Sequence, residues 1–308
     1  MSFKTSLLFE QLIDGYSNVI LTLSQYHAPE KKDLLGKDHT LEARKTPTEH
    51  LSQLISKKRL PEKTPLLLIS CRNVLSNFRC IAYIKDLMPE PLSVLCEIPG
   101  QSKRAYHVFG RKQDKLCIET WDPSKVSYKE FDWFISGVPV LWDNIDQQDL
   151  YKKIVTEAAD HSHVWVLPRG NHPEATEESR DLWQKIQNIF QDTIHESHEN
   201  AYVAIENCIK NYNMKRESNY LHNIIGLDNH GNICQIVENG KLEDLGQKLA
   251  KRSVKRALCV DNSGSITIQF YKKGFPGQAC QLAAAPNHRP YGTAYLVVVL
   301  SDAGFGSL

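Results

Sequence analysis

The sequence predicts an α+β protein with a mixed, mainly antiparallel sheet, a helical N-terminal segment and a helical insertion. Residues 65–143 hold several short runs rich in β-branched and aromatic side chains, separated by Pro, Gly or Asp, which is typical of strands. Residues 146–215 instead place apolar side chains at intervals of three and four, as helices do. Strand-like runs resume at residue 224 and continue to residue 300.

The N-terminal segment, residues 1–64, is predicted to be a helix followed by a connector and a second, short helix. Apolar residues at mixed helical spacing predict the first helix over residues 6–26, with an interruption at Gly15. Residues 27–45 are polar and charged, which favours a connector. The second helix is expected where Thr48 is followed by His50-Leu-Ser-Gln-Leu-Ile55, with a threonine cap near Pro47.

Residues 65–308 are predicted to form one α+β domain, with the helical insertion at about 146–215. Its strands are expected at 66–71, 80–84, 92–98, 105–109, 115–121 and 133–142. Within the insertion, helices are expected at 150–159, 177–190 and 200–209, with a strand at 164–167. The chain then predicts strands at 224–228 and 233–237, a helix at 242–252, two strands within 256–270 and a closing strand at 294–300.

Composition limits the class of protein. The 308 residues are 41% hydrophobic, which is enough to bury one large core or two modest ones. The 37 basic and 36 acidic residues nearly cancel, so no general attraction to nucleic acid or to an anionic membrane is expected. No apolar stretch has the length of a membrane span, and the first residues lack the pattern of a secretion signal. We therefore expect a soluble, cytoplasmic protein.

The clearest chemical signal is the stretch that runs from Arg256 to Phe270. An apolar strand ends there at Asp261, and the small polar residues Asn262, Ser263, Gly264 and Ser265 follow. A carboxylate at the end of a buried strand, next to backbone N–H groups that a tight turn can direct at a ligand, is a common arrangement for a binding or catalytic site. The alternative is an Asx-type turn, in which Asp261 only caps the N–H groups that follow it.

The order of the C-terminal segments resembles the phosphodiester glycosidase family. Val260-Asp-Asn-Ser-Gly-Ser265 is similar to the Leu-Asp-Gly-Gly-Gly-Ser motif that ends a strand in that family. Phe134-Ile-Ser-Gly-Val-Pro-Val-Leu141 resembles its Ser-Gly-Gly-Pro-Leu segment, and Arg289-Pro290 resembles its closing Arg-Pro pair. The resemblance covers roughly residues 130–145 and 220–300. The chain departs from the family where Asn262 and Ser263 replace two glycines, and where His222-Asn223 replaces an Arg-Thr pair.

The resemblance implies a hydrolase, or a related enzyme, that acts on a glycosyl phosphodiester, a sugar phosphate or a nucleotide-like substrate. The catalytic residues would then be Asp261 and His222. The residues expected to bind the small-molecule or glycan substrate are Asn262, Ser263, Gly264, Ser265, Arg289, Asn223, Ser136 and Gly137. The alternative is a catalytically degenerate member of the same fold that binds a ligand, or binds a protein partner through the helical insertion.

Metal and nucleotide cofactors are not expected. Zn²⁺ binding is a weaker alternative. It is considered because five histidines lie within one part of the chain, at His161, His163, His172, His195 and His198. They are not accompanied by a Glu-x-x-His pattern or by a cysteine partner. The sequence contains neither Gly-x-Gly-x-x-Gly nor a Walker-type loop, and its eight cysteines, which form no Cys-x-x-Cys pair, are expected to be reduced residues of the core.

Overall fold

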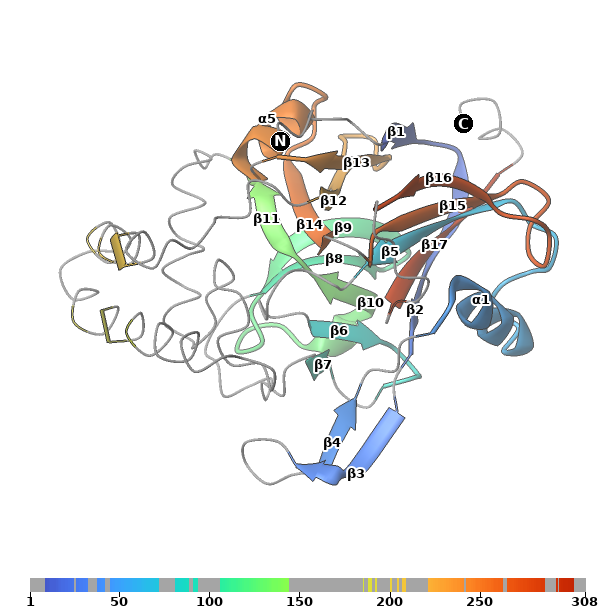
Figure 1. The fold of residues 1–308 in the computed structure, drawn as a ribbon, viewed down its shortest axis with the longest axis horizontal. Coiled ribbons are helices and arrows are strands. Elements are labelled where there is room, and N and C mark those ends of the chain that lie inside the picture. The colour runs from blue at the N-terminus through green and yellow to red at the C-terminus, as the bar shows by residue number, and fades with distance from the viewer. Residues whose placement is uncertain are drawn as a thin grey trace.

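A computed structural model describes most of the N-terminal and C-terminal parts of the chain (Figure 1). The described residues are 9–24, 26–32, 38–41, 45–71, 81–88, 91–93, 106–143, 221–240, 242–262, 265–285, 292 and 294–301, together with eight residues between 185 and 208. All eight of the latter are helical. The helix predicted at 150–159 and the strand predicted at 164–167 lie outside the described residues.

Three five-stranded sheets form the described part of the molecule, and every strand pairing in them is antiparallel. We name each sheet after its middle strand. The β12 sheet has the order β1-β13-β12-β14-β11, the β10 sheet has β7-β6-β10-β8-β9, and the β5 sheet has β16-β15-β5-β17-β2. Strands β3 and β4 form a separate pair. The strands are β1 Phe9–Ile13, β2 Tyr16–Leu23, β3 Tyr26–Lys32, β4 Asp38–Leu41, β5 Leu66–Cys71, β6 Ile81–Ile84, β7 Leu92–Ser93, β8 Tyr106–Lys112, β9 Lys115–Trp121, β10 Phe131–Ser136, β11 Val138–Leu141, β12 Leu221–Leu227, β13 Ile233–Asn239, β14 Arg256–Asn262, β15 Thr267–Tyr271, β16 Cys280–Ala284 and β17 Ala294–Leu300.

The predicted α+β class is wrong, because antiparallel sheet dominates the described residues. Their helices are α1, Pro47–Ser56, α5, Leu242–Ala250, and the 3₁₀ turn η1, Tyr128–Glu130, besides the scattered residues between 185 and 208. Both α1 and α5 were predicted close to these bounds. Strands β3, β4 and β16 were not predicted, and β3 and β4 lie almost entirely within residues 27–45, where a connector was expected. No helix among the described residues is long and apolar enough to cross a lipid bilayer.

The largest correction concerns the predicted N-terminal helix, which is two strands. Gly15, with a φ of 57°, lies at the corner between β1 and β2, and these strands join different sheets. In β2 the four consecutive residues from Val19 to Thr22 are buried. A strand covered on both faces has a continuous apolar run, which periodicity alone cannot distinguish from a segment of buried helix.

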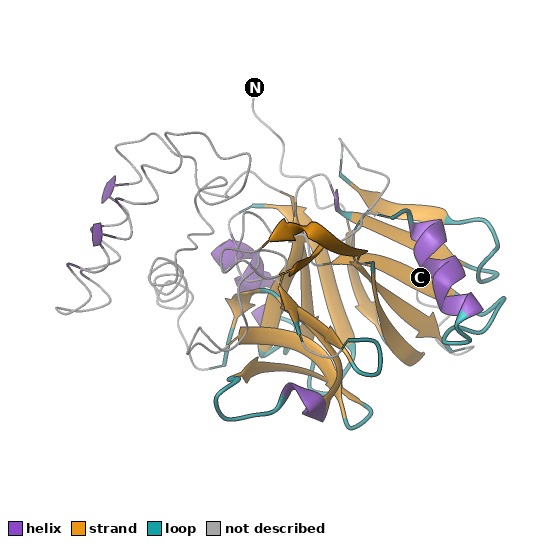
Figure 2. Cartoon of the chain, turned by 90° about the horizontal axis from the view of Figure 1, so that it is seen from below, coloured by secondary structure: helices purple, strands orange, loops and turns teal. Residues whose placement is uncertain are grey.

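The β5 sheet is buried on both faces, and α1 covers one of them (Figure 2). In β5, Leu67 and Ile69 pack into the large core shared with the other sheets, while Leu66 and Leu68 pack with Leu51 of α1. Helix α1 begins at a capping box, in which the Thr46 hydroxyl accepts from the Glu49 N–H and the Glu49 carboxylate accepts from the Thr46 N–H. The cap is therefore one residue before Pro47.

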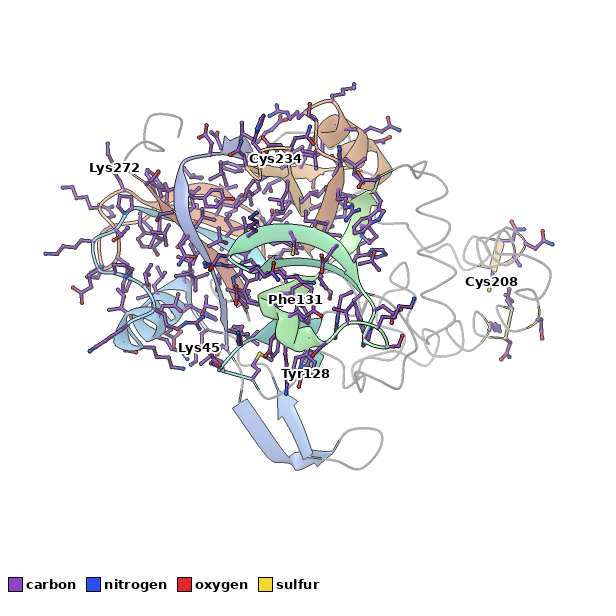
Figure 3. The ribbon with its side chains drawn as sticks, turned by 180° about the vertical axis from the view of Figure 1, so that it is seen from behind. Lys45, Tyr128, Phe131, Cys208, Cys234 and Lys272 are labelled. Carbon is purple, nitrogen blue, oxygen red and sulfur yellow. The ribbon has the colours of Figure 1, made fainter. Side chains whose placement is uncertain are left out.

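The β10 sheet is packed mainly through aromatic rings. The Phe134 ring lies 5.0 Å from Phe131, 4.9 Å from Trp121 and 5.8 Å from Tyr83, measured between ring centroids. Figure 3 labels Phe131 among the closely packed side chains of this sheet. Such offset and edge-to-face contacts add to the free energy of burying the rings. This sheet is thus held together largely by apolar contacts.

Arg256, the first residue of β14, ties the β12 sheet to the β10 sheet. Its Nε donates to Asp143 over 2.9 Å, and one of its terminal nitrogens donates to the Ile118 carbonyl of β9 over 3.0 Å. Its guanidinium also lies 5.0 Å from the centroid of the Trp142 ring. These contacts fix the start of the strand that carries Asp261 near its other end.

Candidate functional site

Asp261 lies near the end of β14, beside a β-bulge. Asn223 of β12 is opposite Asp261, but the next residue, Ile224, is opposite Cys259, so Val260 is an extra residue in β14. A bulge of this kind changes the direction of the side chains that follow it. His222 is opposite Asn262 at the end of the same strand pair. The register therefore brings together both predicted catalytic residues, Asp261 and His222.

The Asp261 carboxylate is buried and bonded to Ser265. The Ser265 hydroxyl donates to Asp261 Oδ1 over 2.7 Å, while the exposed fractions of Asp261 and Ser265 are 0% and 4%. The Cys259 thiol donates to the Asp261 carbonyl over 3.4 Å. Removing a carboxylate from water carries a large cost in free energy unless polar groups compensate for it. The contact between the two predicted site residues supplies part of that compensation.

Asn223 connects the β12 sheet with the β5 sheet. Its Nδ2 donates to the Ser70 carbonyl of β5 over 2.8 Å, and its Oδ1 accepts from Gln235 Nε2 over 2.9 Å. The Ser70 hydroxyl accepts from the Thr267 N–H over 3.0 Å. We call this buried group the polar seam, and its members are Ser70, Asn223, Gln235, Asp261, Ser265 and Thr267.

Sequence reasoning missed three members of the polar seam: Ser70, Gln235 and Thr267. Ser70 and Gln235 stand among apolar residues, in Leu66-Leu-Leu-Ile-Ser-Cys71 and Ile233-Cys-Gln-Ile-Val237. A polar side chain inside an apolar strand needs a buried hydrogen-bonding partner, and this is a signal that could have identified both. The identity of the partner depends on how the sheets meet.

His222 is buried beside the thiol of Cys259. Its exposed fraction is 0%, and its Nδ1 lies 3.7 Å from Cys259 Sγ. The donor in this contact depends on the imidazole tautomer. Both side chains therefore lie at the bulged end of β14, within the protein interior.

Tyr295 of β17 is a buried polar residue on the α1 face of the β5 sheet, and the charge of Asp261 acts on it. Burial is the main cause that raises the pKa of the Tyr295 phenol, and the negative charge of Asp261 raises it further. The Tyr295 ring contacts the imidazole of His50 in α1, with ring centroids 4.9 Å apart. Burial beside α1 and the charge of Asp261 therefore both disfavour ionisation of the Tyr295 phenol.

Ser136 and Gly137 lie where β10 gives way to β11, close to β14. Ser136 is buried, and the Gly137 N–H donates to the His107 carbonyl over 3.0 Å. A Cβ added at Gly137 would lie only 2.6 Å from the Cys259 carbonyl oxygen. Glycine is required here because the two backbones approach so closely. The residue that was predicted to bind substrate therefore has a packing role against β14.

Several predicted site residues lie outside the described residues. These are Ser263, Gly264, Arg289 and all five histidines considered for Zn²⁺, and the side chain of Asn262 is likewise not described. Among the residues that are described, no group of three or more His, Cys, Asp or Glu side chains is arranged to hold a metal ion. The cysteines were predicted to lie in the core. Cys71, Cys234 and Cys259 are buried, whereas Cys280 is exposed.

Comparisons with known proteins identify similar structures but no sequence relatives. No family model matches the chain, and no curated protein matches it. The catalytic domain of zebrafish N-acetylglucosamine-1-phosphodiester α-N-acetylglucosaminidase, auto-inhibited by its pro-peptide, is similar with a TM-score of 0.42 and 12% identity over 95% of this chain and 88% of that chain. A hypothetical protein from Synechocystis is similar with a TM-score of 0.28 and 9% identity over 94% of this chain and 61% of that chain.

Proposed function

We propose that this protein is a hydrolase, or a related enzyme, that acts on a glycosyl phosphodiester, a sugar phosphate or a nucleotide-like substrate. The supporting observation is the hydrogen bond between Ser265 and Asp261 at the end of β14. It joins the two polar residues that begin and end the motif resembling that of phosphodiester glycosidases. A carboxylate and a hydroxyl held in fixed positions at the end of a rigid strand are suited to proton transfer and to binding of an anion.

In this proposal each residue has a distinct chemical role. Asp261 acts as general acid or base, or stabilises positive charge that develops on the sugar, and His222 assists proton transfer. Ser265 and the backbone N–H groups of residues 262–265 hold the phosphate oxygens, and Arg289 neutralises phosphate charge. No metal ion is required for these roles.

Asp261→Asn tests the proposal, because this change keeps the shape of the side chain and its ability to accept from Ser265. We expect wild-type protein to turn over at least one member of a panel of glycosyl phosphodiesters and sugar phosphates, with mass spectrometry as the measurement. The variant should lose about 10²- to 10⁴-fold in rate, the range of general acid–base catalysis. The panel is run with and without divalent metal.

Asp228→Asn provides the matched control. Asp228 caps the β12–β13 turn, where its Oδ1 accepts from the N–H groups of His230 and Asn232 over 2.8 and 2.9 Å. It is a local Asx-type cap far along the strand from Asp261. Its variant should keep full turnover. Unchanged turnover after Asp261→Asn would refute the assigned role.

A second candidate function is ligand or protein binding without turnover. It is favoured by the complete burial of Asp261, His222 and Asn223, each with an exposed fraction of 0%. On this view the polar seam only joins the two sheets. Wild-type protein would then leave the entire panel unchanged, and Asp261→Asn would lower only the free energy of unfolding, by about 1–3 kcal/mol.

A further inference from the structure

A cavity with a mixed polar and apolar lining lies beside α1, apart from the polar seam. We call it the α1 cavity, and its volume is about 220 Å³. It lies between the end of β2, helix α1, and the end of β6 with the turn that follows. Figure 3 labels Lys45 next to α1. The cavity is lined by Leu23, Ser24, Lys45, Gln53, Lys57, Ile84, Leu87 and Met88.

Two of the lining residues carry buried oxygen atoms that lack a hydrogen-bonding partner. Ser24 is only 2% exposed, and its Oγ has no hydrogen-bonding partner among the described residues. The same is true of Gln53 Oε1 on α1. Buried polar atoms are nearly always paired, so two unpaired oxygens on residues that line one cavity need an explanation. A bound molecule that offers a hydroxyl group would pair with them.

The charge of the lining is positive. Lys45 and Lys57 line the α1 cavity, and none of the eight lining residues is acidic. The backbone of Lys45 is held in place by two hydrogen bonds to Gly292, each of 2.9 Å. Glu49, whose charge interacts with that of Lys45, is already engaged by the Thr46 cap at 2.7 Å. The two lysines therefore favour an anionic group on the bound molecule.

The rest of the lining is apolar. Leu23, Ile84 and Met88 contribute to it, together with Leu87, which at 42% exposed is one of the two large hydrophobic side chains exposed in the described part of the chain. An apolar wall with a few polar groups is typical of small-molecule sites. The volume is below the roughly 300–1,000 Å³ of pockets for drug-sized ligands, so the bound molecule must be small.

We propose that the α1 cavity binds a small organic anion of the hydroxycarboxylate class. The carboxylate is attracted by Lys45 and Lys57, the hydroxyl donates to Gln53 Oε1 or bonds to Ser24, and the aliphatic part packs on Ile84 and Met88. No residue of the polar seam lines this cavity. The proposal therefore does not depend on the enzymatic function proposed for Asp261.

The test uses three compounds of similar shape: the α-hydroxy acid analogue of leucine, isocaproate, which lacks the hydroxyl, and the neutral amide of the hydroxy acid. Binding is measured by calorimetry and by the ligand-induced rise in Tm. We expect a Kd on the order of 1 mM or tighter for the hydroxy acid. Isocaproate and the amide should each bind about threefold to tenfold more weakly, because each lacks one of the recognised groups.

Variants of the lining residues test whether the hydroxy acid binds in the α1 cavity. Gln53→Leu should remove the preference for the hydroxy acid over isocaproate, without lowering the Tm of the unliganded protein, since the lost oxygen has no partner. Lys57→Met should weaken carboxylate binding about threefold. Lys58→Asn is the matched control, because it removes an equal charge one residue away, outside the lining, at a φ of 54° that Asn tolerates.

Two results would overturn the proposal. One is the absence of saturable binding of the hydroxy acid up to about 10 mM, a concentration well above the expected Kd. The other is binding that Gln53→Leu and Lys57→Met leave unchanged, or that Lys58→Asn weakens as much as Lys57→Met does. In either case the α1 cavity would not be a hydroxycarboxylate site.

Discussion

The β10 sheet and the polar seam are both buried, but different interactions hold them. In the β10 sheet, the Phe134 ring packs against the rings of Phe131 and Trp121, and these contacts require only shape and apolar area. In the polar seam, Asn223 and Asp261 must each meet a specific donor or acceptor. Apolar packing tolerates substitutions that conserve volume, whereas a buried polar group that loses its partner is costly.

The polar seam therefore costs free energy of folding that an apolar junction between the same two sheets would not cost. Apolar side chains, like those of the β10 sheet, could join the β12 and β5 sheets without the desolvation of buried polar groups. The protein instead places an aspartate, an asparagine and a glutamine at that junction. Buried polar groups of this kind are the first place to look for chemistry, and the following three predictions test the contrast.

The largest effect is expected in the β10 sheet. Phe134 is fully buried, and three other rings surround it. Phe134→Ala should lower the free energy of unfolding by about 3–5 kcal/mol, because it removes the buried ring and leaves a cavity. Urea denaturation measures the change. A loss below about 1 kcal/mol would mean that the aromatic cluster does not stabilise the fold. It would contradict the claim that apolar contacts hold the β10 sheet.

The next effect concerns His50, which links α1 to the β5 sheet through polar contacts. Its Nδ1 lies 3.0 Å from Thr22 Oγ1 and its Nε2 lies 3.3 Å from the Gly292 carbonyl, and burial lowers its pKa from 6.5 to about 4. The unfolded chain therefore binds a proton more readily than the folded protein does. The contribution of neutral His50 to the free energy of unfolding is fully present above pH 6.5. It is lost as the pH falls to about 4, where the loss reaches about 3 kcal/mol.

Stability measured between pH 7 and 4 in wild-type protein and in His50→Gln checks this prediction. The variant should show a flatter pH dependence, because its side chain does not titrate. His230→Gln, at an exposed turn, is the control and should keep the wild-type slope. Equal slopes for wild type and His50→Gln would show that His50 is not the group responsible.

The smallest of the three effects is expected at the polar seam itself. Asn223→Leu conserves volume but leaves the Ser70 carbonyl and the Gln235 amide without the partner that Asn223 provides. The free energy of unfolding should fall by about 2 kcal/mol. Thr120→Val, at an exposed position of the edge strand β9 where the threonine hydroxyl lies 3.4 Å from His107 Nδ1, should change it by no more than about 0.5 kcal/mol. Similar changes in both variants would mean that replacing a polar side chain of the polar seam costs no more free energy of unfolding than replacing one at the surface.

Local sequence was sufficient for the features that depend on neighbouring residues. Helix α1 was predicted from Thr48, the run His50-Leu-Ser-Gln-Leu-Ile55 and a threonine cap near Pro47, and the strand that leads to Asp261 was predicted from its apolar run and polar turn. Most other strands were located for the same reason, since β-branched residues between turn residues favour a strand wherever it finally pairs. Ser265 and Asp261 belong to one sequence motif, four positions apart, and the structure joins them by a hydrogen bond.

The tertiary structure decided what depends on residues distant in the sequence. Strand β1 pairs with β13, placing Phe9 opposite Val237, and β2 pairs with β17, so the segment predicted as one helix is divided between two sheets. Ser70 and Gln235 became part of the site only because the β5 and β12 sheets meet there. The sequence alone determines local conformation and which side chains are apolar, but burial and hydrogen-bonding partners are set by which strands come together, and no local pattern encodes that.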